Sequence, residues 1–168
     1  MKTVLLFFLS IALLVHADRP IKKDEILECV FYHLSETGTL RQDRHGFVYV
    51  DVSDEYIYKT VDYLESEGFH LPPYFCGRDG HGAHITVISA EEARRKGVVI
   101  QEDGQPIFFK VKDCKIIASM REDVDAFCIL TIEAPNLDAI RKKYGLGKYP
   151  YEYHITIGFR TRGLQDAA

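Results

Sequence analysis

Two short segments of the chain carry the same residues, His84-Ile85-Thr86 and His154-Ile155-Thr156, 70 positions apart. Side chains two positions apart in a β-strand point to the same side, so each segment places an imidazole and a hydroxyl on one face. Two imidazoles suit in-line displacement at phosphorus, because histidine takes and gives protons near neutral pH. Threonine hydroxyls then hold the non-bridging oxygens. The sequence therefore predicts a metal-free phosphoester site with His84 and His154 as catalytic residues and Thr86 and Thr156 as phosphate-binding residues.

Other side chains near these segments are candidates for the same site. Arg160 has the strand parity of the second motif, so it is expected to bind phosphate if the strand extends that far; the alternative is a solvated strand end. Gly158 on that face would leave room for a ligand, or would mark a bulge. Tyr49 and Tyr151 are candidates for stacking on a base, with simple packing as the alternative.

The same order of elements precedes both motifs, and this indicates an internal repeat. Each unit has an apolar strand, a polar helix cap, an amphipathic helix, a glycine stop and a loop that leads into the motif. The strands are 47–52 and 126–132, the caps Ser53 and Asn136, and the stops Gly68 and Gly145. We therefore expect an α+β, bilobal duplicated fold in which two antiparallel sheets flank a central cleft, with helices on the outside.

The remaining segments give weaker patterns. Residues 24–35 have helical spacing of apolar side chains, and residues 36–46 are polar and predict a loop. Residues 91–95 predict a short helical turn, and residues 106–119 predict one or two strands. The long loop 69–83 has two prolines and no periodicity, which is typical of functional or mobile loops.

The chain begins with a targeting pattern. Lys2 is followed by a run of apolar residues from Val4 to Val15 and then by small or apolar residues around His16. This predicts a cleavable signal peptide, residues 1–17, and a secreted or periplasmic protein. The run is shorter than a membrane span needs, although an uncleaved anchor is the alternative. Residues 18–168 are then a single domain of two lobes, with no membrane contact after cleavage.

The net charge of −4 argues against extended nucleic-acid binding, which needs many lysines and arginines on phosphates. A nucleotide or one RNA end needs only a local basic patch. The chain has four cysteines, Cys29, Cys76, Cys114 and Cys128, and an exported protein can form disulfides from them. A hairpin would bring Cys114 opposite Cys128, either as a disulfide or as two small residues in a sheet.

The paired H-x-T-x motifs at His84 and His154, in a duplicated strand-helix-strand chain, resemble the 2H phosphoesterase superfamily. The resemblance covers residues 47–160 and rests on the duplication of a short motif. It implies a bilobal α+β fold and metal-independent catalysis by His84 and His154, with Thr86 and Thr156 at the phosphate. It also implies action on 2′,3′-cyclic phosphates, 2′-5′ linkages or RNA 3′ ends. The apparent export and the helix before residue 36 depart from the family pattern.

The sequence thus predicts a hydrolase, a phosphodiesterase that acts on a 2′,3′-cyclic phosphate or related ribonucleotide or RNA-end ester, without cofactor or metal. A module that binds nucleotide or a phosphorylated ligand without turnover is one alternative. A metal-dependent hydrolase built on His81, His84 and Cys76 is another, although zinc sites usually have tighter ligand pairs. Arg78, in the loop before the first motif, is a further candidate to approach the ligand.

Overall fold

The computed structural model describes residues 22–72, 75 and 80–162. The expected signal peptide, Cys76 and Arg78 lie outside these residues. In chain order the elements are α1 (Lys23–His33), β1 (Thr37–Gln42), β2 (Val48–Asp51), α2 (Glu55–Tyr58), α3 (Val61–Glu65), β3 (His84–Ile88), α4 (Ala90–Lys96), β4 (Pro106–Phe108), β5 (Lys110–Ala118), β6 (Val124–Glu133), α5 (Pro135–Lys143) and β7 (His154–Thr161).

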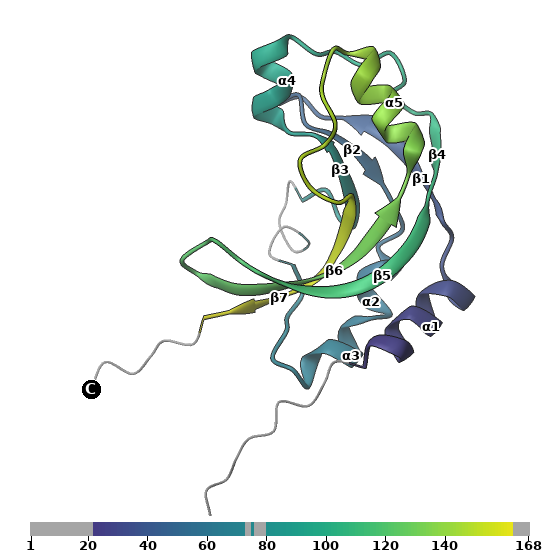
Figure 1. The fold of residues 1–168 in the computed structure, drawn as a ribbon. Helices are drawn as coiled ribbons and strands as arrows, with labels where there is room; N and C mark the ends of the chain where they lie inside the picture. Colours follow the sequence, from purple (N-terminus) through teal and green to yellow (C-terminus); the bar gives the residue numbers. More distant parts are fainter. Residues whose placement is uncertain (1–21, 73–74, 76–79, 163–168) are drawn as a thin grey trace, which may run out of the picture.

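All strands of the described residues belong to one antiparallel sheet in the order β4-β1-β2-β3-β7-β6-β5. A single residue pair, Ile85 with Ile155, joins its two halves, and the sheet curls strongly around this junction (Figure 1). On either side of the junction, β3, β2 and β1 occupy the places that β7, β6 and β5 occupy on the other. The expected α+β class is confirmed. The expected pair of separate sheets is not, because the ladder continues across the middle of the molecule.

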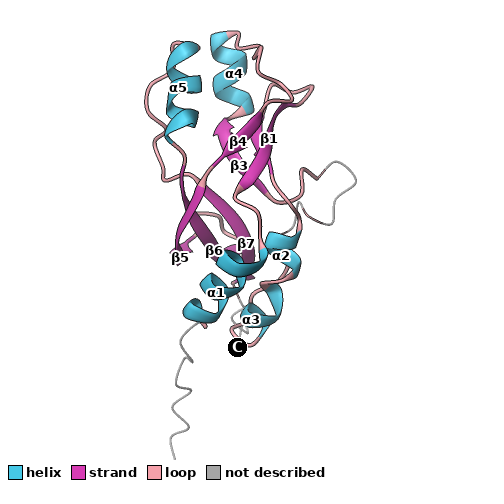
Figure 2. Ribbon diagram, turned by 90° about the vertical axis from the view of Figure 1, so that its right-hand side faces the viewer, coloured by secondary structure: helices cyan, strands magenta, loops and turns pink. Residues whose placement is uncertain are grey.

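The helices form two groups at opposite ends of the sheet, α4 with α5 and α1 with α2 and α3 (Figure 2). Contacts join α1 to β5, α2 and α3 to β7, and α5 to β3. Ile85, Ile155 and Ile157 are fully buried in the core, while the histidines and threonines beside them are only partly buried. The alternation that was expected in each motif strand is therefore present: isoleucines on the covered side, polar residues on the open side.

The segment that was expected to be a loop, 36–46, contains β1. Only Leu40 of this strand is fully buried, and the other side chains are polar or absent, so the sequence shows no apolar alternation. β1 is held instead by backbone hydrogen bonds on both edges, to β2 and to β4. Gly38 is required in it, because a Cβ atom there would lie 2.5 Å from Val50 Cγ1.

The helix that was expected after β2 is broken into α2 and α3. Buried Thr60 lies at the break, and its hydroxyl donates to the carbonyl of Tyr56 at 2.6 Å. A threonine that bonds back to the preceding turn competes with the helical ladder. Ser53 still serves the start of the segment, since its hydroxyl accepts the N–H of Glu55 at 3.3 Å.

Several smaller expectations are confirmed. α1 and α4 form where helical patterns were expected, and residues 106–119 form the two strands β4 and β5. α4 begins at a Ser89 cap that accepts the N–H of Glu92 and ends at Gly97 with φ of 64°. In the described part of the chain, no helix has the length and apolar content needed to cross a membrane.

The expected β5–β6 hairpin forms, but it does not set Cys114 directly opposite Cys128. Cys114 pairs with Leu130, and Cys128 pairs with Ile116, so the two cysteines are diagonal neighbours. They are free thiols with their sulfurs 3.7 Å apart, and both are buried. The pair packs as small core residues beneath the sheet face that carries the histidines.

Candidate active site

A cleft of about 530 Å3 lies on the open face of the sheet. Both motif histidines and both motif threonines line it. The other lining side chains come mainly from the β5–β6 hairpin and from the loop before β7: Ile117, Met120, Arg121, Phe127, Ile129 and Tyr151. The structure therefore brings the four motif residues together from strands 70 positions apart in the sequence.

The strand register explains how the four polar residues are arranged. Because β3 and β7 pair antiparallel at Ile85 and Ile155, His84 lies beside Thr156, and Thr86 lies beside His154. The two imidazoles are thus diagonal, each next to the hydroxyl of the other strand. A phosphate placed over this junction would have an imidazole on each of two opposite sides, as in-line displacement requires.

Both imidazoles are held in the same way. The Nδ1 atom of His84 is 2.9 Å from the carbonyl oxygen of Gly82, and the Nδ1 atom of His154 is 2.8 Å from that of Glu152. A carbonyl oxygen only accepts hydrogen bonds, so Nδ1 carries the proton in each ring. Nε2 is then the nitrogen that exchanges a proton with a substrate.

The surroundings of the two histidines differ. Burial lowers the pKa of His84 below its ordinary value, and the nearby imidazoles of His81 and His154 lower it further, against the opposing hydrogen bond to Gly82. His84 is therefore neutral at neutral pH. A neutral Nε2 can accept a proton, so His84 has the properties of a general base.

The threonine hydroxyls on this face are available to a ligand. Neither Thr86 nor Thr156 makes a side-chain hydrogen bond within the part of the chain that the structure describes, and both side chains are partly exposed. A hydroxyl donates one hydrogen bond and accepts two. Two such donors beside two imidazoles fit the non-bridging oxygens of a phosphate.

Arg160 is not on this face. The β6–β7 register shifts between Cys128 and Ile129, which gives β7 an extra residue at this point. Beyond the shift Arg160 pairs with buried Ala126, and its guanidinium lies 5.0 Å from the centre of the Phe69 ring and 2.9 Å from Asp125. The structure therefore does not bring Arg160 together with the motif residues, because the bulge reverses the strand parity on which the expected phosphate contact rested.

Gly158 lies at that bulge, as one of the two alternatives for it predicted. It pairs with Cys128 on the covered side of the sheet. A Cβ atom at Gly158 would lie 3.0 Å from Leu64 Cδ1 and 3.4 Å from Phe69 Cβ. The glycine thus allows close packing of α3 on β7 and does not make room for a ligand.

The two tyrosine candidates lie in different places. Tyr151 lines the cleft and is 71% exposed, so its ring is accessible to a stacking partner. Tyr49 pairs with Thr86 across β2 and β3, but its ring stacks on Phe47 at 5.3 Å between centroids and meets His81 at 4.7 Å. Tyr49 therefore belongs to an aromatic cluster beside His84.

A larger hollow of about 890 Å3 adjoins the cleft and shares Tyr151 with it. Three lysines line it, and two of them are paired within the hollow: Lys112 pairs with Glu133, and Lys115 pairs with Glu152. This hollow lacks the motif residues, so size alone does not identify the site. The smaller cleft has the groups that can transfer protons.

Two polar residues that support this site were not expected from the sequence. Asp43, in a segment expected to be a loop, binds His81 beside the first motif. Arg141, on the covered stripe of α5, is 2% exposed and bonds to the carbonyls of Val87 and Gly147 and to Glu92. No local pattern marks either residue, because Asp43 meets His81, and Arg141 meets Val87 and Glu92, only when segments distant in sequence come together.

The residues of the alternative metal site are only partly described. Cys76 lies outside the described residues, and His81 and His84 are close to each other, with ring centroids 6.0 Å apart. Among the residues that the structure places, no group of three histidine, cysteine, aspartate or glutamate side chains could hold a metal ion.

Comparison with known proteins agrees with the geometry. Residues 48–165 match the family profile described as the Swiss Army Knife, 2H phosphoesterase domain, and this range contains both motifs. No curated protein matches the chain, and no solved structure does. The match covers most of the chain and implies phosphoesterase activity, so this protein belongs to the 2H phosphoesterase family.

Proposed function

We propose that the protein is a metal-independent phosphodiesterase that hydrolyses a 2′,3′-cyclic phosphate or a related ribonucleotide or RNA-end ester. The observation that carries the proposal is the arrangement of His84 and His154. Both histidines line one cleft, and each donates a hydrogen bond from Nδ1 to a backbone carbonyl. Each also lies beside a threonine of the other strand. Two diagonal imidazoles with Nε2 toward a ligand suit displacement at phosphorus.

The chemistry follows from these positions. His84 Nε2 takes a proton from a water molecule while the water oxygen forms a bond to phosphorus. The bond from phosphorus to one ribose oxygen breaks, and protonated His154 gives its Nε2 proton to that oxygen. The hydroxyls of Thr86 and Thr156 donate to the non-bridging oxygens, whose negative charge grows in the transition state. His84 is assigned as the base because its pKa is lowered, first by burial.

The part of the cleft beyond the histidines suits a flat organic group. Ile117, Phe127 and Ile129 form an apolar wall, and exposed Tyr151 offers a ring for stacking. Stacking on an aromatic side chain is the usual way in which proteins hold an unpaired base. We therefore place the nucleoside of the substrate over the β5–β6 hairpin, with Tyr151 as its stacking partner.

Turnover of 2′,3′-cyclic nucleotides by the purified protein tests the proposal. His84→Ala and His154→Ala are each expected to lower kcat by about 10²- to 10⁴-fold. His33→Ala is a matched control, since His33 is exposed at the end of α1, and it should keep the wild-type rate. A panel of cyclic mononucleotides, 2′-5′ dinucleotides and RNAs with cyclic ends then identifies the preferred ester. Binding without turnover of any of these substrates would favour the binding-module alternative.

Metal dependence is tested separately. Rates measured after treatment with EDTA should equal the untreated rates, and elemental analysis of the active protein should show no stoichiometric metal. Activity that is lost to EDTA and regained with a metal ion would replace the proposed mechanism with the metal-dependent alternative.

We also propose that the protein acts outside the cytoplasm. The support is the pattern of residues 1–17, a basic start followed by a short apolar run. N-terminal sequencing of the protein from the cell exterior or periplasm should give a first residue at Asp18. A mature chain that retains residues 1–17 would contradict cleavage.

A further inference from the structure

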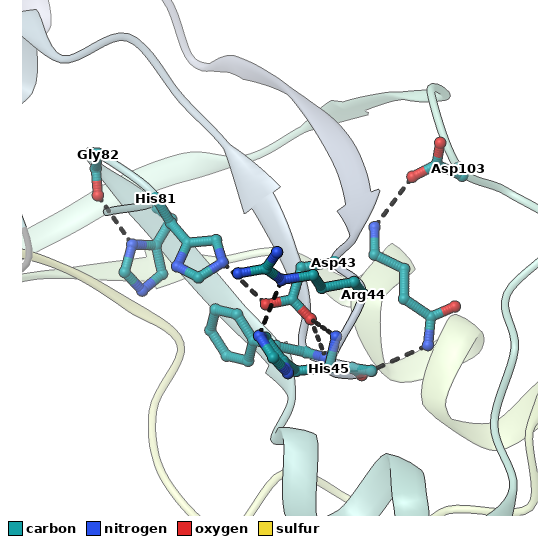
Figure 3. Close-up of polar contacts among 10 residues, drawn as sticks. Asp43, Arg44, His45, His81, Gly82 and Asp103 are labelled. Carbon is teal, nitrogen blue, oxygen red and sulfur yellow. Dashed lines mark hydrogen bonds and ion pairs between the residues drawn. The ribbon is translucent and has the colours of Figure 1, made fainter. Parts of the chain in front are cut away.

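A second histidine beside the first motif is fixed by an acidic residue that is distant in the sequence. His81 Nε2 lies 3.1 Å from Asp43 Oδ2, and the side chains are 27% and 18% exposed. The other oxygen of Asp43 accepts the backbone N–H groups of His45 and Phe47 at 2.8 and 2.9 Å. Figure 3 shows this carboxylate between the turn after β1 and His81. The position of His81 is therefore set, through Asp43, by the main chain of the turn between β1 and β2.

The carboxylate is an acceptor at neutral pH. Partial burial raises the pKa of Asp43. The hydrogen bonds from Phe47, His45 and His81 outweigh this effect and hold the pKa below its ordinary value. Two aromatic side chains also pack against the ring of His81. Its centroid lies 4.7 Å from that of Tyr49 and 5.1 Å from that of Phe47, in edge-to-face geometry.

Gly82 connects this anchored residue to the catalytic histidine. Its carbonyl oxygen accepts a hydrogen bond from His84 Nδ1 at 2.9 Å. Gly82 has φ of 65°, and a Cβ atom there would lie 2.3 Å from Asp54 Oδ1. The next residue, Ala83, donates its N–H to the same oxygen of Asp54 at 2.8 Å. Carboxylates thus hold the chain on both sides of Gly82, at His81 and at Ala83.

A glycine between two fixed points has little freedom to turn its carbonyl, although glycine alone has more backbone freedom than any other residue. The direction of this carbonyl decides which nitrogen of His84 carries the proton, because the ring nitrogen that bonds a carbonyl must be protonated. If the carbonyl turned away, His84 would be free to adopt the tautomer with the proton on Nε2, which cannot act as a base toward a ligand.

We propose that the Asp43–His81 pair positions the Gly82 carbonyl and thereby keeps His84 in the tautomer that accepts a proton on Nε2. His81 acts through Gly82, so it is a positioning residue for His84. The proposal rests on the proposed function of the site for its catalytic consequence, but its structural content, the tautomer of His84, does not depend on turnover.

The second motif provides an internal reference. His154 Nδ1 bonds to the Glu152 carbonyl in the same way, but the Glu152 side chain points to Lys115, at 2.8 Å, in an ion pair whose members are 65% and 39% exposed. His154 therefore has no counterpart of the Asp43–His81 anchor among the residues described around it. Loss of the anchor should change His84 and leave His154 as it was.

The experiment compares two substitutions of His81 in the full-length protein. His81→Leu removes the bond to Asp43, whereas His81→Gln keeps an N–H donor near the place of Nε2. We expect His81→Leu to lower kcat by about 10- to 100-fold and to change KM by less than about threefold, because a misplaced base costs rate without a lost substrate contact. His81→Gln should retain most of the wild-type kcat. Asp43→Asn, which puts a donor opposite His81, gives a second test if His81→Leu does not fold.

Nitrogen NMR of the histidine side chains supplies the direct measurement. In the wild type, His84 and His154 should both show a protonated Nδ1. In His81→Leu only the His84 signals should move toward the other tautomer, and in His81→Gln they should not. His45→Ala is the matched control in the same turn, since its backbone N–H to Asp43 remains, and it should match the wild type in both measurements.

The outcomes separate the possibilities. Wild-type kcat and an unchanged His84 tautomer in His81→Leu would overturn the proposal. A rise in KM at constant kcat would instead show that His81 touches substrate, and a loss of kcat in His81→Gln with the tautomer intact would show that its imidazole is needed for the reaction itself; either result also overturns the proposal. If the wild type hydrolyses none of the substrates, the proposed function fails, but the tautomer comparison still decides the positioning role.

Discussion

The motif histidines show how neighbours differentiate two residues of the same type and strand position. Each donates a hydrogen bond from its Nδ1–H to the carbonyl two residues before it. The surroundings of His84 lower its pKa, since burial and two nearby imidazoles, those of His81 and His154, oppose a positive charge on it. The base and the acid are thus assigned by environment, in a site where the sequence makes the two residues equivalent.

This assignment predicts the pH dependence of kcat/KM. The base must be neutral, so activity is lost as the pH falls through the pKa of His84. Because that pKa is lowered, the acidic limb of the bell-shaped profile should lie below the ordinary histidine value. Rates measured across pH give both limbs, and the apparent values belong to the coupled pair of histidines. An acidic limb above the ordinary value would contradict the assignment of His84 as the base.

The threonines have a separate test, because valine has nearly the shape of threonine and lacks the hydroxyl. Thr86→Val and Thr156→Val should each lower kcat by about 10²-fold, the usual cost of removing one donor to a developing negative charge. Serine at either position should restore most of the rate. Steady-state kinetics of the four variants measures this, and valine variants with wild-type kcat would exclude phosphate contacts by these hydroxyls.

At the scale of the element, the register shift in β7 separates the part of the strand that serves the site from the part that serves the core. Before the shift, His154 and Thr156 lie on the open face. After it, Arg160 lies on the covered side, over Phe69 and beside Asp125. A one-residue bulge moves every later side chain to the other face. The eight residues of β7 can therefore line the site at one end and pack in the core at the other.

The bulge predicts that Arg160 affects stability and not catalysis. Arg160→Leu should leave kcat and KM within about twofold of the wild type, because Arg160 makes no contact with the substrate in the ground state or the transition state. It should lower the free energy of unfolding by about 1 kcal/mol through loss of the cation–π contact and a half-exposed ion pair. Urea denaturation together with kinetics measures both effects. A tenfold loss of kcat in the folded variant would show instead that Arg160 takes part in catalysis.

For the whole molecule, the junction between the two halves of the sheet is the critical place. β3 and β7 share one residue pair and then diverge. Near the point of divergence Arg141 donates to the Val87 carbonyl at 2.7 Å and to the Gly147 carbonyl at 2.9 Å, and it binds Glu92 through two hydrogen bonds of 2.9 Å. Arg141 thus links β3, α4, α5 and the chain that leads to β7.

Arg141 is therefore expected to be the most costly single residue to lose in this region. Arg141→Met should lower the free energy of unfolding by about 3–5 kcal/mol, because Glu92 and two carbonyls would lose their partner. Thermal and urea denaturation measure the change. Lys142→Met, an exposed neighbour on the same helix, is the control and should change the free energy of unfolding by less than about 0.5 kcal/mol.

The same ion pair predicts how stability depends on pH. The Arg141 guanidinium holds the pKa of Glu92 below its ordinary value, so the paired carboxylate stabilises the fold above the ordinary glutamate range. This contribution is lost as the pH falls through the lowered pKa of Glu92. The wild type should therefore be more stable than Glu92→Gln at neutral pH, and the difference should shrink toward zero in acid. A difference that stays constant with pH would contradict the ionised pair.

Much of the site follows from local pattern alone. The two H-I-T segments, their period of two and the elements before them predict which side chains share a face, and the family match agrees with the motif. Local pattern failed where stability comes from elsewhere. β1 forms although only Leu40 of it is fully buried, because two neighbouring strands supply its hydrogen bonds. The helix after β2 breaks at Thr60, whose side chain bonds to the preceding turn.

The motif, the faces of its two strands and the class of chemistry can be read from the amino-acid sequence, because they depend on residue type and on the spacing of neighbours along the chain. The position of His84 beside Thr156, the core-facing side chain of Arg160 and the bond between Asp43 and His81 could be found only in the folded molecule. Strand register, bulges and contacts between distant segments depend on how the whole chain packs. These features, and not the motif residues alone, distinguish the two imidazoles from each other.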